Sequence, residues 1–332
     1  MTTALDQETE VDQIDDLAFV TMMGRLNRLS VDKHFDAYAD IAWDDAELAL
    51  DSTDPRLRLP ASDPVASTDW YRGLTATEQA EVGLYRLAAC MKMGWQFENL
   101  LQRGLLTYAF RLGNGDPSFR YLHHEVIEES QHTLMFQELT NRSGLPVRGM
   151  AGTVRFLAEV AIFRLVKVDP AMFFVFVLGG EDPVDHLQRT MLRDGVPHPL
   201  VERIMRIHVT EEARHLSFAR HVLKRQVPRS GAVRRTALSL VAPVVMGAMA
   251  RMMLRPPADL RRHCDMPRSA VRQAFRSAEG RRLLKESVGK TRKLCTELGL
   301  MTRAARMLWK AFGIWEEPVP ATSAASSGSA AA

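Results

Sequence analysis

Apolar residues recur at helical spacing along most of the chain, and proline, glycine and capping residues mark the breaks between the periodic stretches. No alternating stretch is long enough to indicate a strand. The pattern predicts main helices over residues 16–33, 75–111, 117–144, 150–167, 170 into 181, 199–226 and 231–254. Two or three short basic helices follow, to Phe312. Residues 34–74, rich in Asp, Ser and Pro, predict a loop with little regular structure.

Two of these helices are apolar on every side. The helix that opens at Pro170 carries AMFFVFVLGG, and the helix of residues 231–254 contains TALSLVAPVVMGAMA. Helices without a polar face are buried inside a bundle, so the sequence predicts an all-α fold. We divide the chain into an N-terminal tail and first helix (1–34), a helical domain (35–313) and a disordered tail (314–332). Residues 1–14 are also expected to be disordered, and the tail is of low complexity from Pro318.

The composition is that of a globular protein able to bury a large core, since the 332 residues are 46% apolar and 25% charged. The apolar run of residues 236–250 contains Pro243 and is shorter than the roughly 20 residues of a membrane span. We therefore expect a buried helix and no membrane association. The N-terminus lacks the apolar core of a signal peptide. With three cysteines at no metal-binding spacing, this indicates a reduced, cytoplasmic protein.

Charge is distributed unevenly along the chain. Residues 214–310 contain 23 Lys or Arg against 5 Asp or Glu, whereas the remainder is acidic by 35 to 20. A basic half can attract nucleic acid or anionic lipid. No aromatic residues are interleaved with the arginines for base stacking, so we expect no nucleic-acid partner. The favoured interpretation is pairing with the acidic half, within or between chains.

The pattern Glu-x-x-His occurs twice, at Glu129–His132 and at Glu212–His215, each time within a predicted helix. A Glu and a His three residues apart lie on one face of a helix. Two such pairs facing each other across a bundle supply half of a dinuclear iron or manganese site. A single copy is usually a solvated pair that arises by chance. Two copies together favour metal.

His208 adds a third side chain to the second motif. It lies four residues before Glu212 and seven before His215, so the three fall within an arc of about 60° on the helix. A lone histidine on an apolar helix is often a satisfied core residue. Its register with the Glu-x-x-His pair favours a ligand, and one helix can then supply three ligands.

A complete dinuclear site of this kind needs a Glu from each of two further helices. Glu98 lies among apolar residues in GWQFENLL, and Glu181 ends a very apolar run. Burying a carboxylate is costly unless it is neutralised, and metal binding is the simplest explanation, although Glu181 before Pro183 also fits a helix cap. Four glutamates balance two divalent cations. Mixed imidazole and carboxylate ligands suit iron or manganese better than structural zinc.

Other polar residues near the motifs carry weaker assignments. His123 and His124 are interpreted as structural or exposed. Glu128 and Glu211 are rotated about 100° from the ligands that follow them, and either support those ligands or face solvent. Asp185, four residues after Glu181, is a weak candidate for orienting a ligand histidine.

The order of these residues resembles the non-haem di-iron N-oxygenases typified by para-aminobenzoate N-oxygenase. HVTEEARH and EESQHTLM carry the resemblance, FDAYADIAWD and TRKLCTELGL match more weakly, and it spans roughly residues 35–300. It implies a ferritin-like helical bundle with additional flanking helices, and a homodimer. It also implies two iron ions, with manganese as an alternative, held by Glu98, Glu129, His132, Glu181, His208, Glu212 and His215.

The resemblance further implies N-oxygenation of an aryl amine through hydroxylamine towards nitroso or nitro, with O2 as co-substrate. Because the chain has no glycine-rich dinucleotide motif, electrons would come from a separate ferredoxin or reductase. Lys285 and Arg292 are candidates for holding a substrate carboxylate, although each is more often a surface residue. The Gly179–Pro183 segment predicts a kink or bulge beside Glu181.

Four alternatives remain open on the sequence. The first is a di-iron hydroxylase or fatty-acyl desaturase acting on another substrate. The second is a metal-storage or oxidant-scavenging protein. A ribonucleotide reductase radical subunit would need a tyrosine beside the iron, for which Tyr85, Tyr108 and Tyr121 lie on nearby helices. The last is a non-catalytic, metal-binding helical protein whose ligands are vestigial.

Overall fold

The computed structural model describes residues 4–317, and within that range the chain is helical, with no strand. The long helices are α1 (Ala4–Asp32), α3 (Ala76–Ala109), α4 (Ser118–Arg142), α5 (Gly152–Val168), α6 (Pro170–Asp194), α7 (Pro199–Gln226) and α8 (Ala232–Leu254). The short ones are α2 (Asp69–Arg72), α9 (Ala258–His263), α10 (Arg268–Arg276), α11 (Ala278–Ser287), α12 (Gly289–Glu297) and α13 (Arg303–Ala311). The predicted all-α fold is confirmed.

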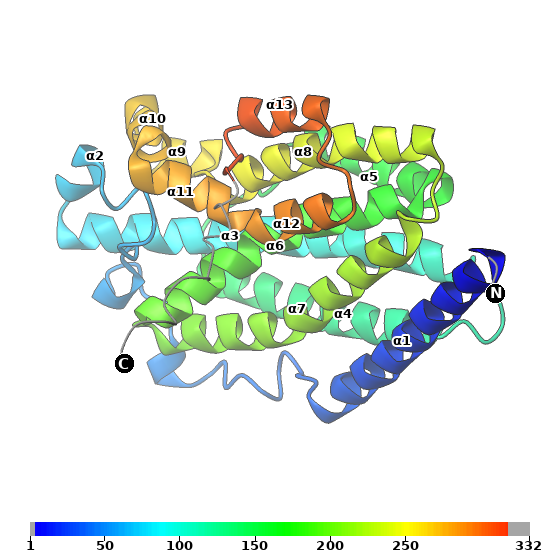
Figure 1. Ribbon diagram of the computed structural model, residues 1–332. Helices are drawn as coiled ribbons and strands as arrows, with labels where there is room; N and C mark the ends of the chain where they lie inside the picture. The colour runs from blue at the N-terminus through cyan, green and yellow to red at the C-terminus, as the bar shows by residue number, and fades with distance from the viewer. Residues whose placement is uncertain (1–3, 318–332) are drawn as a thin grey trace, which may run out of the picture.

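Four helices, α3, α4, α6 and α7, form the centre of the molecule (Figure 1). Helix α3 packs along α4, and α6 packs along α7. Helix α5 lies against α3 and α6, α8 covers α6, and α13 rests on α8. On another side α1 packs against α4 and α7. This is a ferritin-like bundle with flanking helices, in which side chains from facing helices meet in the interior.

Local signals in the sequence set the starts of the helices that carry the centre. At the start of α3, Thr75 accepts from the backbone N–H of Glu78 and Glu78 accepts from that of Thr75, which completes the predicted capping box. Asp169 caps α6 by accepting from the N–H of Ala171, with Pro170 at the first helical position. These caps fix the register in which Glu98 and Glu181 reach the interior.

The ends of the chain differ from the sequence prediction. Helix α1 begins at Ala4, so the expectation of disorder over residues 1–14 is wrong for residues 4–14; this stretch has no Gly or Pro to stop a helix. Between α8 and residue 317, where the described part of the chain ends, there are five short helices instead of the predicted two or three, because Pro267 and the Ser277 cap divide the basic segment. Ile314 is fully buried and belongs to the folded part. The tail from Pro318 lies outside the described residues.

The two glycines before Glu181 serve close packing. Helix α6 continues as α-helix from Pro170 to Asp194 with Pro183 inside it, so the predicted bulge at Gly179–Pro183 is absent, while the alternative of a kink stays a prediction. A Cβ on Gly180 would lie 1.9 Å from the ring of Phe97, and one on Gly179 would lie 2.9 Å from Val245. The missing side chains thus let α3 and α8 approach α6 on either side of the buried glutamate.

Helix α8 passes a length and composition test for a membrane span within residues 232–263, the one stretch among the described residues to do so. More than half of its most apolar window, 56%, is buried inside the protein. Leu238, Ala242 and Met246 are almost inaccessible and belong to the main hydrophobic cluster. This burial accords with a core helix, as the sequence predicts.

Candidate metal centre

Seven acidic and imidazole side chains meet at the centre of the bundle. Helix α3 supplies Glu98, α4 the first Glu-x-x-His pair, α6 Glu181, and α7 three residues. Each of the seven is at most 2% exposed: Glu98, Glu129, His132, Glu181, His208, Glu212 and His215. Burying so many ionisable groups costs free energy that only mutual pairing or a cation offsets.

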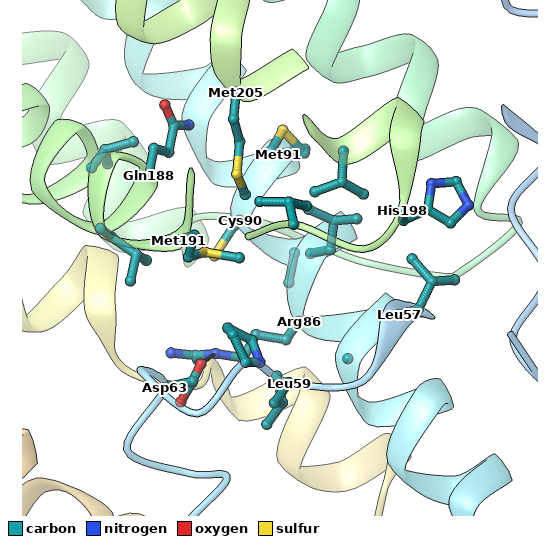
Figure 2. Close-up of a pocket in the computed structure, with 18 of the residues that line it drawn as sticks. Leu57, Leu59, Asp63, Arg86, Cys90, Met91, Gln188, Met191, His198 and Met205 are labelled. Carbon is teal, nitrogen blue, oxygen red and sulfur yellow. Dashed lines mark hydrogen bonds and ion pairs between the residues drawn. The ribbon is translucent and has the colours of Figure 1, made fainter. Parts of the chain in front are cut away.

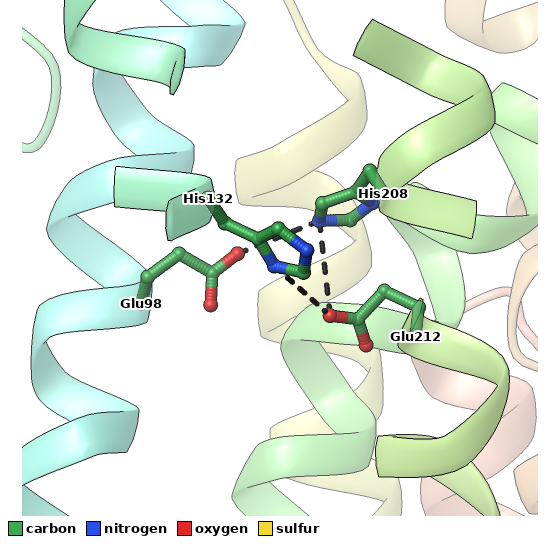
Figure 3. A group of neighbouring side chains, drawn as sticks. All are labelled: Glu98, His132, His208 and Glu212. Atoms are coloured by element: carbon green, nitrogen blue, oxygen red, sulfur yellow. Dashed lines mark ion pairs between the residues drawn. The ribbon is translucent and has the colours of Figure 1, made fainter. Parts of the chain in front are cut away.

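Six of these side chains form two overlapping groups of four. One group contains Glu98, His132, His208 and Glu212, shown in Figure 3, and the other contains Glu129, His132, Glu212 and His215. In each group one ligand atom per residue lies within 4.8 Å of all the others. His132 and Glu212 belong to both groups. Two overlapping clusters with shared members are the geometry expected for a pair of metal ions.

Glu181 lies next to these groups but is a member of neither. It is 2% exposed, and burial followed by the charges of Glu212 and Glu129 raises the pKa of its carboxyl group well above the usual value. The helix-cap alternative is wrong, because Glu181 sits in the middle of α6. Glu181 therefore faces the same anionic centre from the fourth helix.

Hydrogen bonds define which ring nitrogen of each histidine faces inward. His132 Nδ1 lies 3.1 Å from Glu129, and its Nε2 lies 2.9 Å from Glu211. His215 repeats the arrangement, with Nδ1 3.0 Å from Glu212 and Nε2 2.8 Å from Glu128. Both rings thus point Nδ1 at the centre and Nε2 at an outer carboxylate.

His208 is turned the other way. Its Nδ1 lies 2.8 Å from the amide oxygen of Gln188, while its Nε2 lies 3.5 Å from Glu98 and 3.8 Å from Glu212. Burial, followed by the positive charge of His132, holds the pKa of His208 well below its usual value. A neutral ring that donates through Nδ1 leaves the Nε2 lone pair free for a metal.

The outer carboxylates, Glu128 and Glu211, are neither solvent-facing nor metal-facing. Both are buried, and Arg214 on α7 lies 2.9 Å from Glu128 and 3.4 Å from Glu211. The sequence left open whether these residues support the ligands or face water, and the structure shows that they contact the ligand histidines. Acids that accept from a ligand imidazole fix its tautomer and raise its basicity.

The protonation states show how the centre behaves without a cation. Burial, and then Glu129 and Glu181, raise the pKa of Glu98 well above the usual range. Burial lowers the pKa of His132, but its hydrogen bonds to Glu129 and Glu211 outweigh burial and raise that pKa to about 10. Protons therefore take the place of cations, as expected when like charges share a buried site.

The donor atoms fit a pair of hard or borderline divalent ions. Glu98 Oε2, Glu212 Oε2 and His208 Nε2 are buried without a hydrogen-bond partner. The described groups contain carboxylate oxygens and imidazole nitrogens but no thiolate. Such a mixture suits iron or manganese. These three unpartnered atoms are the ones that a bound metal would contact.

Three residues at the centre were missed or misjudged from the sequence. Gln188, and not Asp185, orients a histidine; Asp185 pairs instead with Arg189 and Lys290. Glu125 is 1% exposed, and burial raises its pKa well above the usual value. It precedes Glu129 by four residues on the same face of α4, which was a usable signal.

The proposed substrate contacts Lys285 and Arg292 are not supported. One cavity of about 730 Å³ reaches Glu98, Glu181 and His208, and neither basic residue lines it. Arg292 instead donates to the carbonyls of Lys285 and Ile314 and pairs with Glu316. It anchors the end of the folded chain, which a sequence does not show because the partners are backbone atoms.

Removing an outer carboxylate is expected to weaken metal binding without removing a ligand. In Glu211→Ala, His132 loses the acceptor at Nε2, and the metal dissociation constant should rise about 10- to 100-fold. Competition with a chromophoric chelator measures it. Glu202→Ala, on the outer part of α7, is the matched control and should bind as the wild type does. Equal affinities for the two variants would contradict the orienting role.

The fold and the site define the class of protein as a ferritin-like helical protein with a buried carboxylate–histidine centre. A sequence model of the family described as P-aminobenzoate N-oxygenase AurF matches residues 18–299. The chain therefore belongs to the AurF family.

Two mycobacterial proteins are similar over most of their length. The uncharacterized protein Rv0885 of Mycobacterium tuberculosis and the uncharacterized protein Mb0909 of Mycobacterium bovis are each 39% identical to this chain over 302 residues. The alignment covers 90% of this chain and 88% of each relative. Neither name assigns an activity. The family supports an oxygenase of the di-iron type, and the relatives add no substrate.

Proposed function

We propose that the protein is a di-iron oxygenase that uses O2 to convert an aryl amine to its hydroxylamine and onward to the nitroso or nitro compound. The observation that carries this proposal is the pair of overlapping four-residue groups in a member of the AurF family. We assign seven metal ligands: Glu98, Glu129, His132, Glu181, His208, Glu212 and His215. Iron is the expected metal, and manganese fits the same donors.

When bound, the metal pair supplies the reduction of O2 and the transfer of one oxygen atom, chemistry that no side chain provides. The protein's own residues hold the pair and keep water away. Glu212, which has two carboxylate oxygens and belongs to both groups, would contribute to holding both ions, whereas His132 would hold one of them through Nδ1. Phe97 and Phe136 line the cavity near Glu98 and His208 and present apolar surface to a substrate. Such a dry pocket limits side reactions with water.

Conversion of the amine to the hydroxylamine inserts one atom of O2, and two electrons from outside reduce the second atom to water. Oxidation of the hydroxylamine to the nitro compound by a second O2 balances without further outside electrons, because the substrate itself supplies them. We propose a ferredoxin or reductase as the donor. We also propose a homodimer, which rests on the family resemblance, and a cytoplasmic location, which accords with three cysteines that form no disulfide.

Metal analysis and turnover together test the proposed function. Purified protein should contain about two equivalents of iron or manganese. The iron form, given a chemical reductant and O2, should convert para-substituted anilines to hydroxylamine, nitroso or nitro products, detected by mass spectrometry with ¹⁸O2. Less than one metal equivalent would favour a vestigial site. Two equivalents with hydroxylation at carbon instead of nitrogen would assign a di-iron hydroxylase or desaturase.

A further inference from the structure

The cavity that reaches the candidate metal centre is much longer than an aminobenzoate. Its lining includes Glu98 and His208, which we call the metal end, and Arg86 and Asp63, which we call the far end. Glu98 and Arg86 lie on the same helix, α3, twelve residues apart. At about 1.5 Å per residue their Cα atoms are about 18 Å apart. A single benzene ring spans less than half of that length.

The wall between the two ends is apolar and adaptable. Five methionines line the cavity, together with several leucines and valines: Met91, Met93, Met191, Met205 and Met253. Methionine side chains are flexible and adapt to irregular or extended ligands. The volume of about 730 Å³ lies in the upper part of the range of small-molecule sites. The middle of the cavity is thus suited to an aliphatic chain.

The far end carries a buried donor with nothing to bind. Arg86 is 6% exposed; its Nε pairs with Asp63, and its Nη2 donates to the carbonyl of Leu254 over 2.8 Å. Its Nη1 has no hydrogen-bond partner. Figure 2 shows the Arg86–Asp63 pair at one side of the cavity, with Cys90 and Met191 between it and Met205. An unpaired buried donor is costly unless a ligand satisfies it.

The charge at this end selects the kind of group that fits. Asp63 already neutralises the Arg86 guanidinium. A substrate carboxylate would place a second buried anion beside Asp63, which is unfavourable. An uncharged acceptor such as an amide or ester carbonyl satisfies Nη1 without adding charge.

We propose that the cavity binds an elongated substrate: an oxidisable group at the metal end, an apolar chain along α3, and an uncharged carbonyl accepting from Nη1 of Arg86. This inference rests on the proposed function for the position of the reacting group. It narrows the substrate from small aryl amines to long ones with a carbonyl at the far end.

Equilibrium binding tests the inference apart from catalysis. The probes are anilines with a para alkyl chain of two to ten methylenes that ends in a primary amide. Anilines of the same chain lengths that end in a methyl group or a carboxylate serve as comparison probes. Isothermal titration is run anaerobically on the metal-loaded protein. The dissociation constant should fall about fourfold per added methylene until the amide reaches Arg86. At that length the amide should bind at least about tenfold more tightly than the methyl-ended probe.

Three variants test separately where the amide of the probe binds and where its alkyl chain lies. Arg86→Leu combined with Asp63→Leu removes the ion pair as a unit and should abolish the preference for the amide. Cys90→Phe narrows the middle of the cavity and should weaken the long probes at least tenfold while the shortest keeps its affinity. Arg103→Leu, an exposed site on α3, is the control and should leave every constant unchanged. Should the double variant fail to fold, Cys90→Phe decides alone.

Several results would overturn the inference. Affinity independent of chain length would show that the cavity does not hold the chain. A carboxylate-ended probe that binds most tightly at low salt would assign exposed arginines of the cavity lining, such as Arg56, Arg58 and Arg72, as the partners of the probe instead of Arg86. Neither result would contradict the proposed function, because neither depends on metal content or on N-oxygenation. Conversely, an enzyme that oxidises no aniline would contradict the proposed function even if the dependence on chain length survived.

Discussion

Protein stripped of metal is expected to melt roughly 10 °C below the metal-loaded protein. A ligand present at about 1,000 times its dissociation constant stabilises the native state by about 4 kcal/mol, and each kcal/mol shifts the melting temperature of a chain this large by about 2–4 °C. The structural reason is the set of buried carboxylates: burial and neighbouring acids raise the pKa values of Glu98 and Glu181. Without a cation the fold must protonate these groups or bear their repulsion.

Calorimetry of both forms, with and without a chelator, measures this difference, and Glu98→Gln provides the internal control. A glutamine resembles the protonated acid that the metal-free protein favours, so the metal-free variant should melt at or above the wild-type temperature. Metal should raise the melting temperature of this variant by at most half as much as it raises that of the wild type, because the variant lacks one carboxylate ligand. Equal melting temperatures for metal-free and metal-loaded wild type would contradict a metal centre at this position.

The bundle was predictable because its signals are local. Thr75 with Glu78, and Asp169 with Pro170, mark helix starts by groups that satisfy the first backbone N–H donors. The all-apolar run before Glu181 predicts directly that this part of the helix is buried. The number of short helices after α8 was harder, since basic segments of similar composition differ only in where Pro267 and Ser277 interrupt them.

The inner residues of the candidate centre were predictable for a related reason. Glu-x-x-His and the four-residue step from His208 to Glu212 fix positions on one helix face before any tertiary contact is known. Their convergence needed only that four helices pack together. The contact of His132 with Glu211, and of His215 with Glu128, instead joins α4 to α7. The sequence therefore supplied Glu128 and Glu211 as candidates but not their partners.

The cavity was not predictable from spacing at all. Its walls combine α3, α6 and α7 with the loop before α3. That loop reaches α3 only because Gly83 has no side chain: a Cβ there would lie 1.8 Å from the carbonyl oxygen of Leu57. Arg86 and Asp63 are 23 residues apart and meet only through this packing. Lys285 and Arg292 were proposed as substrate contacts from their charge alone. The charge of an arginine does not reveal whether its N–H groups already donate to backbone carbonyls.

We expect Glu212→Ala to remove both metal ions and to lower the proposed N-oxygenation activity by at least about a thousandfold, whereas His208→Ala should lose one metal ion. Glu212 belongs to both four-residue groups, while His208 belongs to the group that contains Glu98. In Glu212→Ala each ion loses a charged oxygen ligand, and catalysis by a metal pair fails with either ion missing. Metal analysis after gel filtration should give near zero equivalents for Glu212→Ala and about one for His208→Ala.

His221→Ala provides the matched control on the same helix. Its ring is exposed, with Nδ1 2.7 Å from the carbonyl of Ser217, so the variant should keep two equivalents and full activity. Circular dichroism must show that all three variants remain helical, which separates loss of metal from loss of fold. If Glu212→Ala retained two tightly bound ions, Glu212 could not be shared between them, and the two overlapping groups would have to hold metal independently of their common carboxylate.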